Sequence, residues 1–160
     1  MHSTAEKLNI RAATAADIEA LVALRFAFLE EFRHIGGDTK TRLDPEIRGY
    51  FTRHLGKPDF VALLGEVDGQ PAGTVFLTIC EGPPNDQYPN GLIGYVFNMY
   101  TQPALRGRGY AKTLMGYLIA DARRLGVTAI NLNASSAGRP LYETLGFNVL
   151  NDTAMRMMLS

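Results

Sequence analysis

The sequence predicts an α/β fold, with a mixed β-sheet that carries helices on both faces. Segments with the alternating or continuous apolar pattern of strands interchange with segments whose apolar residues recur at helical spacing. Their order along the chain is βααβββαβαββ. The 160 residues contain no internal repeat and no linker, so we expect one domain over residues 1–160, with its core at about residues 8–159.

The composition is that of a globular protein without a polyionic partner. Hydrophobic residues make up 46% of the chain, and 16 basic residues balance 16 acidic ones. This balance gives no reason to expect nucleic acid or a membrane surface as a partner. The three histidines show no metal-ligand spacing, so we expect no metal.

Cysteine usage and the N-terminal segment indicate a cytoplasmic protein. Cys80 is the only cysteine, which excludes an intrachain disulfide and fits a reducing compartment. It falls in the apolar run GTVFLTIC, where we expect a small core residue. The N-terminal MHSTAEKLNI lacks the apolar segment of a signal peptide, and no stretch approaches the ~20 apolar residues of a membrane span.

A strand and a helix are predicted over residues 7–32. KLNIRAAT alternates Leu8 and Ile10 with polar neighbours, as a strand with one buried face does. Thr14 is a candidate N-cap, and Asp17 lies three residues on, where a carboxylate favours a helix start. Arg25 interrupts the apolar stripe of this helix. We interpret it as a side chain that reaches solvent past apolar neighbours, with a binding role as the alternative.

A second helix is predicted over DPEIRGYFTRHLG, residues 44–56. The preceding GGDTKTR breaks the helical pattern. Asp44 is expected as the cap, Pro45 as the first helical residue and Gly56 as the residue just past the end.

Two strands joined by a tight turn come next, followed by a fourth strand. DFVALLGEVDGQPAGTVFLTIC places strand-like runs on both sides of Asp68-Gly69, a strong hairpin signal. After a loop rich in Pro and Gly, LIGYVFNMYT at residues 92–101 is nearly continuous in apolar and aromatic residues. We therefore expect a central strand that is covered on both faces.

The C-terminal third predicts a long helix and four short elements. The long helix has its apolar stripe from Ala111 onward and ends at Gly126. VTAINLN is the fifth strand, and GRPLYETLG is a short helix. FNVLN and AMRMML, residues 147–151 and 154–159, are predicted as a closing pair of strands.

An Arg/Gly cluster, RGRGYA at residues 106–111, stands where the fourth strand leads into the long helix. A helix N-terminus exposes unpaired N–H groups and the positive end of the helix dipole, a combination that binds phosphate. Glycines let the backbone approach a ligand because they have no Cβ. We therefore predict a phosphate or pyrophosphate site formed by main-chain amides. The alternative is a Gly-rich turn with two solvated arginines.

Two common phosphate motifs do not fit this cluster. The dinucleotide fingerprint would need a glycine where Lys112 stands. A Walker A loop would need glycine at positions 106 and 111, which hold Arg and Ala. The cluster is therefore neither of these two motifs, which leaves a different phosphate-binding loop or a Gly-rich turn.

The cluster matches the R/Q-x-x-G-x-G/A signature of the GNAT superfamily of acyl-CoA-dependent N-acyltransferases, with Arg106, Gly109 and Ala111 at the defining positions. NMYTQPALRGRGYAKTLM resembles the family's fourth strand, loop and third helix, and LYETLGF at residues 141–147 resembles its second motif. The element order covers nearly the whole family fold. The resemblance implies a mostly antiparallel sheet whose fourth and fifth strands splay apart.

The same resemblance implies acetyl-CoA as the co-substrate. The coenzyme A pyrophosphate would lie on the signature loop and the first helical turn, at Arg106, Gly107, Arg108, Gly109, Tyr110, Ala111 and Lys112. The pantetheine arm would pair with main-chain groups of Met99 and Thr101 in the splay. Ser135 is placed to help hold the cofactor, with capping of the following helix as its alternative role.

Tyr142 is the catalytic residue that the resemblance implies. A phenol with a pKa of ~10 can donate its proton to a departing thiolate; a half-buried tyrosine in a structural role is the alternative. The fourth strand carries no carboxylate to act as general base, so Glu30, Glu31 and Glu81 are the candidates by topology. Each is alternatively a solvated surface charge, and an acceptor amine that is partly neutral needs no dedicated base.

These inferences define an N-acetyltransferase in which a primary amine attacks acetyl-CoA directly within a ternary complex. The family builds its acceptor site from the loops RHIGGDTKTR and EGPPNDQYPNG, whose mixed charge favours a small-molecule amine over a basic peptide. A non-catalytic acyl-CoA-binding module and a protein N-acetyltransferase are the alternatives. A homodimer is expected by analogy with relatives.

Overall fold

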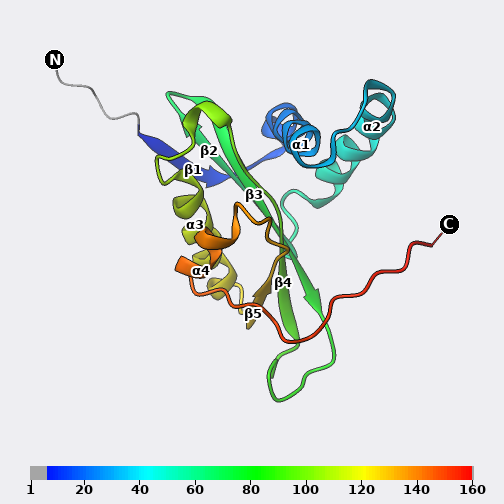
Figure 1. Ribbon diagram of the computed structural model, residues 1–160, viewed down its shortest axis with the longest axis vertical. Helices are drawn as coiled ribbons and strands as arrows, with labels where there is room; N and C mark the ends of the chain where they lie inside the picture. The colour runs from blue at the N-terminus through cyan, green and yellow to red at the C-terminus, as the bar shows by residue number, and fades with distance from the viewer. Residues whose placement is uncertain (1–6, 160) are drawn as a thin grey trace.

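A computed structural model of the protein describes residues 7–159 as a five-stranded sheet between two layers of helices (Figure 1). The N-terminal segment in which no signal peptide is predicted lies partly outside the described residues. In chain order the elements are β1 (Leu8–Ala12), η1 (Ala15–Asp17), α1 (Ile18–Arg33), α2 (Gly37–His54), β2 (Phe60–Val67), β3 (Gln70–Glu81), β4 (Leu92–Thr101), η2 (Pro103–Leu105), α3 (Tyr110–Arg124), β5 (Ala129–Asn131) and α4 (Arg139–Thr144).

The sheet is mixed and mostly antiparallel. Its strands lie in chain order from β1 to β5, and each neighbouring pair is antiparallel except β4 and β5, which run parallel. Helices α1 and α2 cover one face of the sheet, and α3 and α4 cover the other (Figure 1). The predicted fold class is confirmed.

Strands β4 and β5 separate soon after they meet. They pair only where Ile93–Tyr95 faces Ala129–Asn131, whereas β4 stays paired to β3 as far as Thr101. Within residues 7–159, no strand flanks the later part of β4 on the side away from β3. The expected splay between these two strands is therefore present.

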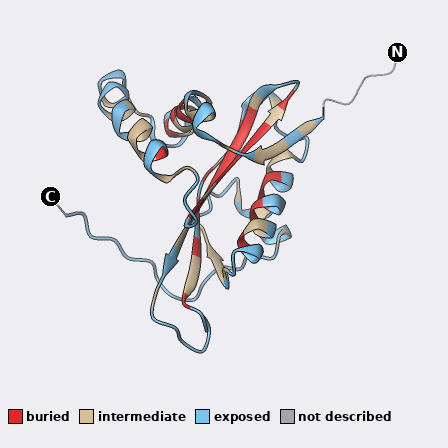
Figure 2. Cartoon of the chain, turned by 180° about the vertical axis from the view of Figure 1, so that it is seen from behind, coloured by how far each residue is buried: buried red, intermediate tan, exposed pale blue. Residues whose placement is uncertain are grey.

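The core is divided between the two faces of the sheet. Figure 2 shows that buried residues concentrate in the middle of the long strands and on the inner sides of the helices. On the α1/α2 face the buried cluster is Leu21, Val22, Phe26, Leu29, Phe51, Phe60, Ala62 and Phe76. On the α3/α4 face it is Leu63, Val75, Leu77, Val96, Leu114, Met115, Leu118 and Ala122.

The entry into α1 is fixed by a network of charged side chains. The Thr14 N–H donates to Asp17 Oδ2 at 2.7 Å, as the predicted helix start requires. The Arg11 guanidinium holds both Asp17 oxygens at 2.8 Å and also donates to both oxygens of Glu66 on β2. Arg11 thereby joins β1, the start of the helical layer and β2, and it lowers the pKa of Asp17 well below its ordinary value.

Helix α2 begins earlier than its sequence pattern predicts. It starts at Gly37, so Pro45 lies inside the helix and Asp44 is not its cap. Instead, Asp44 Oδ1 accepts a hydrogen bond from Arg48 Nε, one turn later, at 2.6 Å. The additional turns place Leu43 against the α1/α2 cluster, and this packing outweighs the backbone hydrogen bond that a proline cannot donate. The predicted end is confirmed, because Gly56 follows the helix with φ of +80°.

The hairpin and the long helix follow their local sequence signals. Asp68 and Gly69 have φ values of +51° and +75°, the pattern of a type I′ turn, and they connect β2 to β3 as predicted. Helix α3 ends at Arg124, and Gly126 follows with φ of +78°. The short fifth strand and the short helix after it are also present.

The far ends of β3 and β4 are less covered than the sequence predicts. Cys80 is exposed at the end of β3, so the expectation of a core cysteine is wrong. Tyr95 and Phe97 on β4 are 40% and 52% exposed. These ends extend past the helices that cover the middle of the sheet (Figures 1 and 2). Apolar composition alone does not show where that cover stops.

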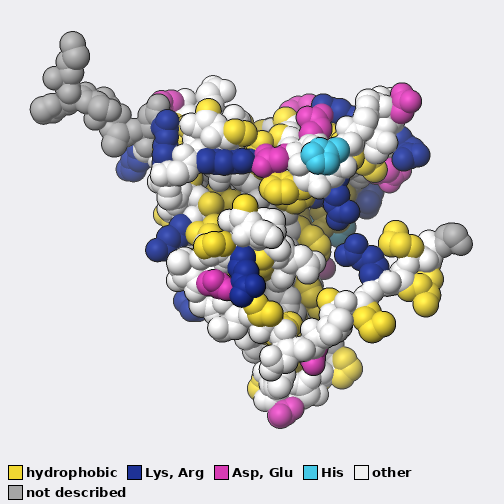
Figure 3. Space-filling model, viewed as in Figure 1, with side chains coloured by type: hydrophobic (Ala, Val, Ile, Leu, Met, Phe, Trp, Pro, Cys, Tyr) yellow, Lys and Arg dark blue, Asp and Glu magenta, His cyan; other side chains and the backbone are white. Residues whose placement is uncertain are grey.

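The predicted closing strands do not form. Residues 147–159 contain no helix or strand, and the segment runs away from the sheet (Figure 1). Phe147, at its start, packs against the α3/α4 cluster, whereas the large apolar side chains from Val149 onward are at least 68% exposed. Figure 3 shows the end of this segment standing clear of the body of the molecule. A strand needs a partner edge as well as a suitable composition, and β5 pairs over only three residues, all with β4.

Neither a membrane-crossing helix nor a group of metal-binding side chains occurs in the part of the chain that the structure describes. No helix there combines the length and apolar character that a bilayer requires. Likewise, no three or more His, Cys, Asp or Glu side chains in residues 7–159 are placed to hold a metal ion.

We predict that Asp17→Asn lowers the free energy of unfolding by about 1–3 kcal/mol at pH 7, because it removes a charged helix cap and leaves Arg11 underpaired. The depressed pKa of Asp17 means that its stabilisation is present above about pH 4 and lost on acidification. In urea unfolding, the difference in unfolding free energy between Asp17→Asn and the wild type should be smaller at pH 3 than at pH 7. Glu19→Gln is the control, because the Glu19 side chain is 81% exposed in its pair with Arg48. Equal effects of the two substitutions would contradict this prediction.

Candidate functional site

The Arg/Gly loop requires glycine because of its backbone conformation. Gly107 and Gly109 have φ values of +77° and +80°, and Gly109 is the residue from which α3 starts. A Cβ added at either position would meet no heavy atom within 4 Å. The glycines are therefore not required by close packing against the protein. They shape a loop whose outer side is open.

The first turn of α3 has the features of an anion site. It carries no acidic side chain, and Lys112 lies exposed within it. The amides at the start of a helix have no acceptor inside the helix, and the dipole adds positive potential there. The donors of Thr113 are used within the helix: its N–H and its hydroxyl both donate to the Gly109 carbonyl, at 3.1 and 3.0 Å. The open amides and Lys112 can bind a phosphate group.

Arg106 has a different environment from the glycines. Its guanidinium pairs with Glu31 of α1 at 2.6 and 2.9 Å, and its Nε donates to the Thr101 carbonyl at 2.9 Å. It also lies over the Tyr100 ring, 5.4 Å from the centroid. The Glu31 carboxylate raises the pKa of Arg106. Arg106 thus connects the loop to α1 and β4, and this role was not apparent from the sequence.

A β-bulge interrupts β4 where the strand has lost β5. Phe76 pairs with Phe97 and Thr74 with Tyr100, so the two β4 residues between them face the single β3 residue Val75. The bulge includes Asn98, which has φ of +54° and is 4% exposed. A non-glycine residue in this conformation is strained, and such strain is concentrated at functional sites.

The bulge directs neighbouring side chains to specific faces. Phe97 and Asn98 both lie on the α1/α2 face, where Asn98 Oδ1 accepts a hydrogen bond from Arg25 Nη1 at 3.1 Å. Met99 packs against the cluster on the α3/α4 face. The strand therefore presents groups to both layers within three residues.

Buried polar atoms without hydrogen-bond partners gather around the bulge. In residues 7–159 they are Thr78 Oγ1, Asn98 Nδ2 and Thr101 Oγ1, and all three belong to β3 or β4. Such groups are rare in folded proteins, because each costs free energy. Their position makes this part of the sheet a candidate functional region.

Tyr142 lies on the α3/α4 face. It is half-buried and packs against the same cluster as Met99, with the Phe147 ring 5.9 Å from its own. Burial raises the pKa of the Tyr142 phenol above 10. The tyrosine therefore stays protonated at neutral pH, as a proton donor must.

Ser135 closes the turn that leads into α4. Its Oγ accepts a hydrogen bond from the Gly138 N–H at 3.1 Å, and its carbonyl accepts from the Gly138 and Arg139 N–H groups. The N-cap of α4 is Gly138, so Ser135 stabilises the entry to the helix and is not its cap residue. The Ser135 side chain remains exposed at the end of the loop after β5.

The three candidate bases come from two places: Glu30 and Glu31 are neighbours on α1, and Glu81 ends β3. Glu30 Oε1 accepts a hydrogen bond from Lys40 Nζ at 2.9 Å, and Glu31 is paired with Arg106. Glu81 is exposed at the end of β3, opposite Leu92. None of the three lines the cavity described next.

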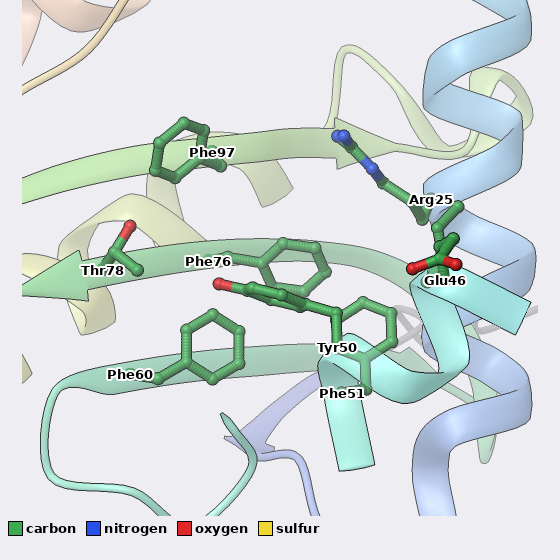
Figure 4. A pocket seen from close by; sticks show the side chains of 9 residues that line it. Arg25, Glu46, Tyr50, Phe51, Phe60, Phe76, Thr78 and Phe97 are labelled. Atoms are coloured by element: carbon green, nitrogen blue, oxygen red, sulfur yellow. The ribbon is translucent and has the colours of Figure 1, made fainter. Parts of the chain in front are cut away.

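A cavity of about 410 Å³ lies between α1, α2 and the sheet (Figure 4). Sequence reasoning did not identify it, because its residues come from five separate elements. Two of the lining residues are charged, and five are aromatic. The lining residues are Arg25, Glu46, Ile47, Tyr50, Phe51, Phe60, Phe76, Thr78 and Phe97.

The fold, the splayed strands and the glycine loop at α3 define an acyl-CoA-dependent transferase architecture. Residues 21–147 match the Acetyltransferase (GNAT) family over more than half of the chain, so the protein belongs to that family. The family resemblance of the sequence is thereby confirmed. A search of the curated proteins finds no match.

Solved structures with this fold extend the comparison. A predicted acetyltransferase from Clostridium acetobutylicum, solved with acetyl-CoA, is 30% identical, with a TM-score of 0.84 and coverage of 94% of this chain and 96% of that one. A GCN5-related N-acetyltransferase from Ralstonia eutropha is 24% identical, with a TM-score of 0.81 and coverage of 94% and 99%. A ribosomal-protein-alanine N-acetyltransferase from Brucella melitensis is 20% identical, with a TM-score of 0.73 and coverage of 96% and 100%.

Proposed function

We propose that this family member is an N-acetyltransferase that moves the acetyl group of acetyl-CoA to a primary amine of a small molecule. The observation that carries the proposal is the position of the cavity. It lies beside the β4 bulge, because Phe97 lines it and the lining residue Arg25 donates a hydrogen bond to Asn98. Tyr142 lies on the opposite face of the sheet. Acceptor and cofactor would approach the bulge from the two sides of the sheet.

The cofactor side is supported by the start of α3 and by the splay. The pyrophosphate of coenzyme A would bind the amides of residues 107–112, with Lys112 beside it. The pantetheine arm would follow the open side of β4, where Met99 and Thr101 lie without a neighbouring strand. An N–H group at the bulge would stabilise the oxyanion that forms on the thioester carbonyl.

The proposed reaction is direct transfer within a ternary complex. The neutral amine attacks the thioester carbonyl carbon, a C–N bond forms and the C–S bond breaks. Tyr142 donates its phenolic proton to the departing thiolate and recovers a proton from solvent. The proton that the amine gives up also leaves to solvent.

No dedicated base is proposed for the amine. Glu30 and Glu31 are held in ion pairs, and Glu81 lies at the exposed end of β3. The amine would therefore react through its neutral fraction, which grows as pH rises toward an amine pKa of ~10.

A small-molecule acceptor is favoured by the cavity of about 410 Å³, a volume within the range of small-ligand sites. Proteins with this fold are named for protein acceptors and for small-molecule acceptors. The Brucella structure is named for ribosomal-protein alanine, and another structure is named for aminoglycosides. A non-catalytic acyl-CoA-binding module is the second candidate, favoured by the missing base. It would bind acetyl-CoA and release no thiol with any amine.

We also propose that two copies associate through residues 148–159, the C-terminal segment. Every residue of this segment is exposed, and its six large apolar side chains are each at least 68% exposed. Apolar surface of this kind is typical of an interaction site. The segment is extended and β5 has an open edge, so reciprocal pairing about a two-fold axis would cover both copies.

We predict that Gly109→Val weakens acetyl-CoA binding about tenfold or more, because valine disfavours the positive φ and its side chain enters the phosphate path. Calorimetric titration with acetyl-CoA is the measurement. Gly116→Val on the exposed side of α3 is the matched control and should leave the Kd unchanged. A folded Gly109→Val protein with wild-type affinity would refute the placement of the pyrophosphate.

We predict that Tyr142→Phe lowers kcat about 100-fold and leaves the Kd of acetyl-CoA within about twofold, as loss of a general acid does. Thiol release with an acceptor amine measures kcat. Because burial raises the pKa of Tyr142, the wild type should gain activity with pH and show no alkaline decline below about pH 10. Tyr117→Phe, at an exposed tyrosine of α3, is the control. Unchanged kcat in Tyr142→Phe across this range would remove the residue from the mechanism.

We predict that the wild-type protein is a dimer at about 10 μM, and that the double substitution Met155→Glu, Met157→Glu makes it monomeric, because charge opposes burial of the segment. Light scattering coupled to size exclusion gives the molar mass. Gln87→Glu, in an exposed loop, adds charge elsewhere and should leave the dimer intact. A monomeric wild type would show that the segment is not a dimer contact.

A further inference from the structure

Arg25 is a half-buried cation without an anionic partner. It lies on α1 and lines the cavity, and within residues 7–159 no carboxylate forms an ion pair with it. Its contacts are a hydrogen bond from Nη1 to Asn98 Oδ1 and the Phe28 ring, 5.7 Å away. By contrast, Arg11, Arg48 and Arg106 each pair with a carboxylate.

An unpaired charge in this position is costly. Burial lowers the pKa of the Arg25 guanidinium, which nevertheless keeps its proton at any physiological pH. The guanidinium has five N–H donors, and Asn98 occupies one. An anion in the cavity would balance the charge and accept hydrogen bonds from two of the four remaining donors. The planar guanidinium matches a carboxylate, which it can bind through two parallel hydrogen bonds.

The remainder of the cavity is aromatic. The Tyr50 ring lies 5.5 Å from Phe60, the Phe51 ring lies 5.3 Å from Phe76, and Phe60 and Phe76 are 5.9 Å apart. These rings face the cavity together with Phe97, and Arg25 reaches it from α1 (Figure 4). A wall of interlocked rings favours an apolar or aromatic group in the ligand.

We propose that the acceptor is a free α-amino acid with an apolar or aromatic side chain. Its carboxylate binds Arg25, its side chain occupies the aromatic part of the cavity, and its α-amine faces the β4 bulge. This inference rests on the proposed acetyl transfer and specifies its substrate. The product is an N-acetyl amino acid: the α-nitrogen gains the acetyl group, and coenzyme A leaves as the thiol.

The position of Arg25 explains why the α-amine is selected. Its hydrogen bond to Asn98 places the guanidinium beside the strained residue of the bulge, where the thioester is proposed to lie. In an α-amino acid, one carbon joins the carboxylate and the amine. A carboxylate bound by Arg25 therefore keeps the amine next to the bulge. A terminal amine on a long side chain would instead be directed into the aromatic region.

Other amines fit these features less well. The N-terminal residue of a protein has its carboxyl group in a peptide bond, so it offers Arg25 no charge. An amino sugar phosphate offers an anion but no apolar group for the five rings. A simple arylalkylamine fills the aromatic region and leaves Arg25 without its partner.

The first test uses the wild-type protein with acetyl-CoA and four acceptors, with released thiol as the signal. L-Phenylalanine should exceed phenethylamine and L-phenylalaninamide in kcat/KM by about 10- to 100-fold, the worth of a hydrogen-bonded charge. It should also exceed glycine, which lacks the apolar group. Equal rates for L-phenylalanine and phenethylamine would overturn the proposal and leave acetyl transfer standing.

Variants of Arg25 locate the effect. Arg25→Gln should remove the preference for L-phenylalanine over phenethylamine, and Arg25→Lys should retain part of it, because a lysine keeps the charge and loses the planar fork. Arg33→Gln, two turns along the same helix and exposed, should keep the full preference. A preference that survives in a folded Arg25→Gln protein would overturn the assignment.

A binding experiment separates this inference from the transfer reaction. 3-Phenylpropionate and 3-phenylpropan-1-ol carry no amine and differ only in the charged group. Calorimetric titration of the protein without cofactor should give binding of the carboxylate about tenfold or more tighter than of the alcohol, and Arg25→Gln should abolish the difference. This result would support the Arg25 site even if no amine were acetylated. No difference in the wild type would overturn the proposal.

Discussion

Beyond Tyr95, β4 is hydrogen-bonded to β3 alone, because β5 diverges after three paired residues. This loss of a neighbour is the constraint on which the candidate site depends. A continuous sheet would satisfy the main-chain groups of β4 on both sides and leave nothing for a ligand. The main-chain groups on this open side are therefore available to an extended ligand, as the groups of an edge strand are.

The bulge at Asn98 lies in the same segment of β4 and sets the directions of its side chains. An extra residue opposite Val75 changes the alternation of side chains, so Phe97 and Asn98 face the α1/α2 layer while Met99 faces the α3/α4 layer. The Arg106–Glu31 pair then joins the loop before α3 to α1. One strand thus couples the glycine loop, Tyr142 and the aromatic cavity, although these features belong to opposite sides of the sheet.

Local signals account for what the sequence predicted well. The Asp68-Gly69 turn and the start of α3 at Gly109 each depend on a backbone conformation that few residues adopt, so single residues reveal them. The predicted start of α2 was wrong because Asp44 and Pro45 have the local pattern of a helix start. The helix instead begins at Gly37, and its added turns include Leu43, which packs against the α1/α2 cluster. The closing strands were wrong for a related reason: strand composition does not specify a partner edge.

Arg25 shows most clearly where sequence reasoning ends. A cation that interrupts an apolar stripe has the same local pattern whether it reaches solvent or lines a cavity. The difference depends on Asn98, 73 residues later in the chain, and on the lack of an ion pair to Arg25 within residues 7–159, although Glu46 lines the same cavity. The other lining residues are mostly aromatic or aliphatic; the polar exceptions are Thr78, Tyr50 and the exposed Glu46. A single unpaired charge in apolar surroundings has a large effect on which ligand is tolerated, because a neutral ligand would leave that charge buried without compensation. In the proposed complex, the electrostatics of the cavity therefore select the acceptor more strongly than the cavity's shape does.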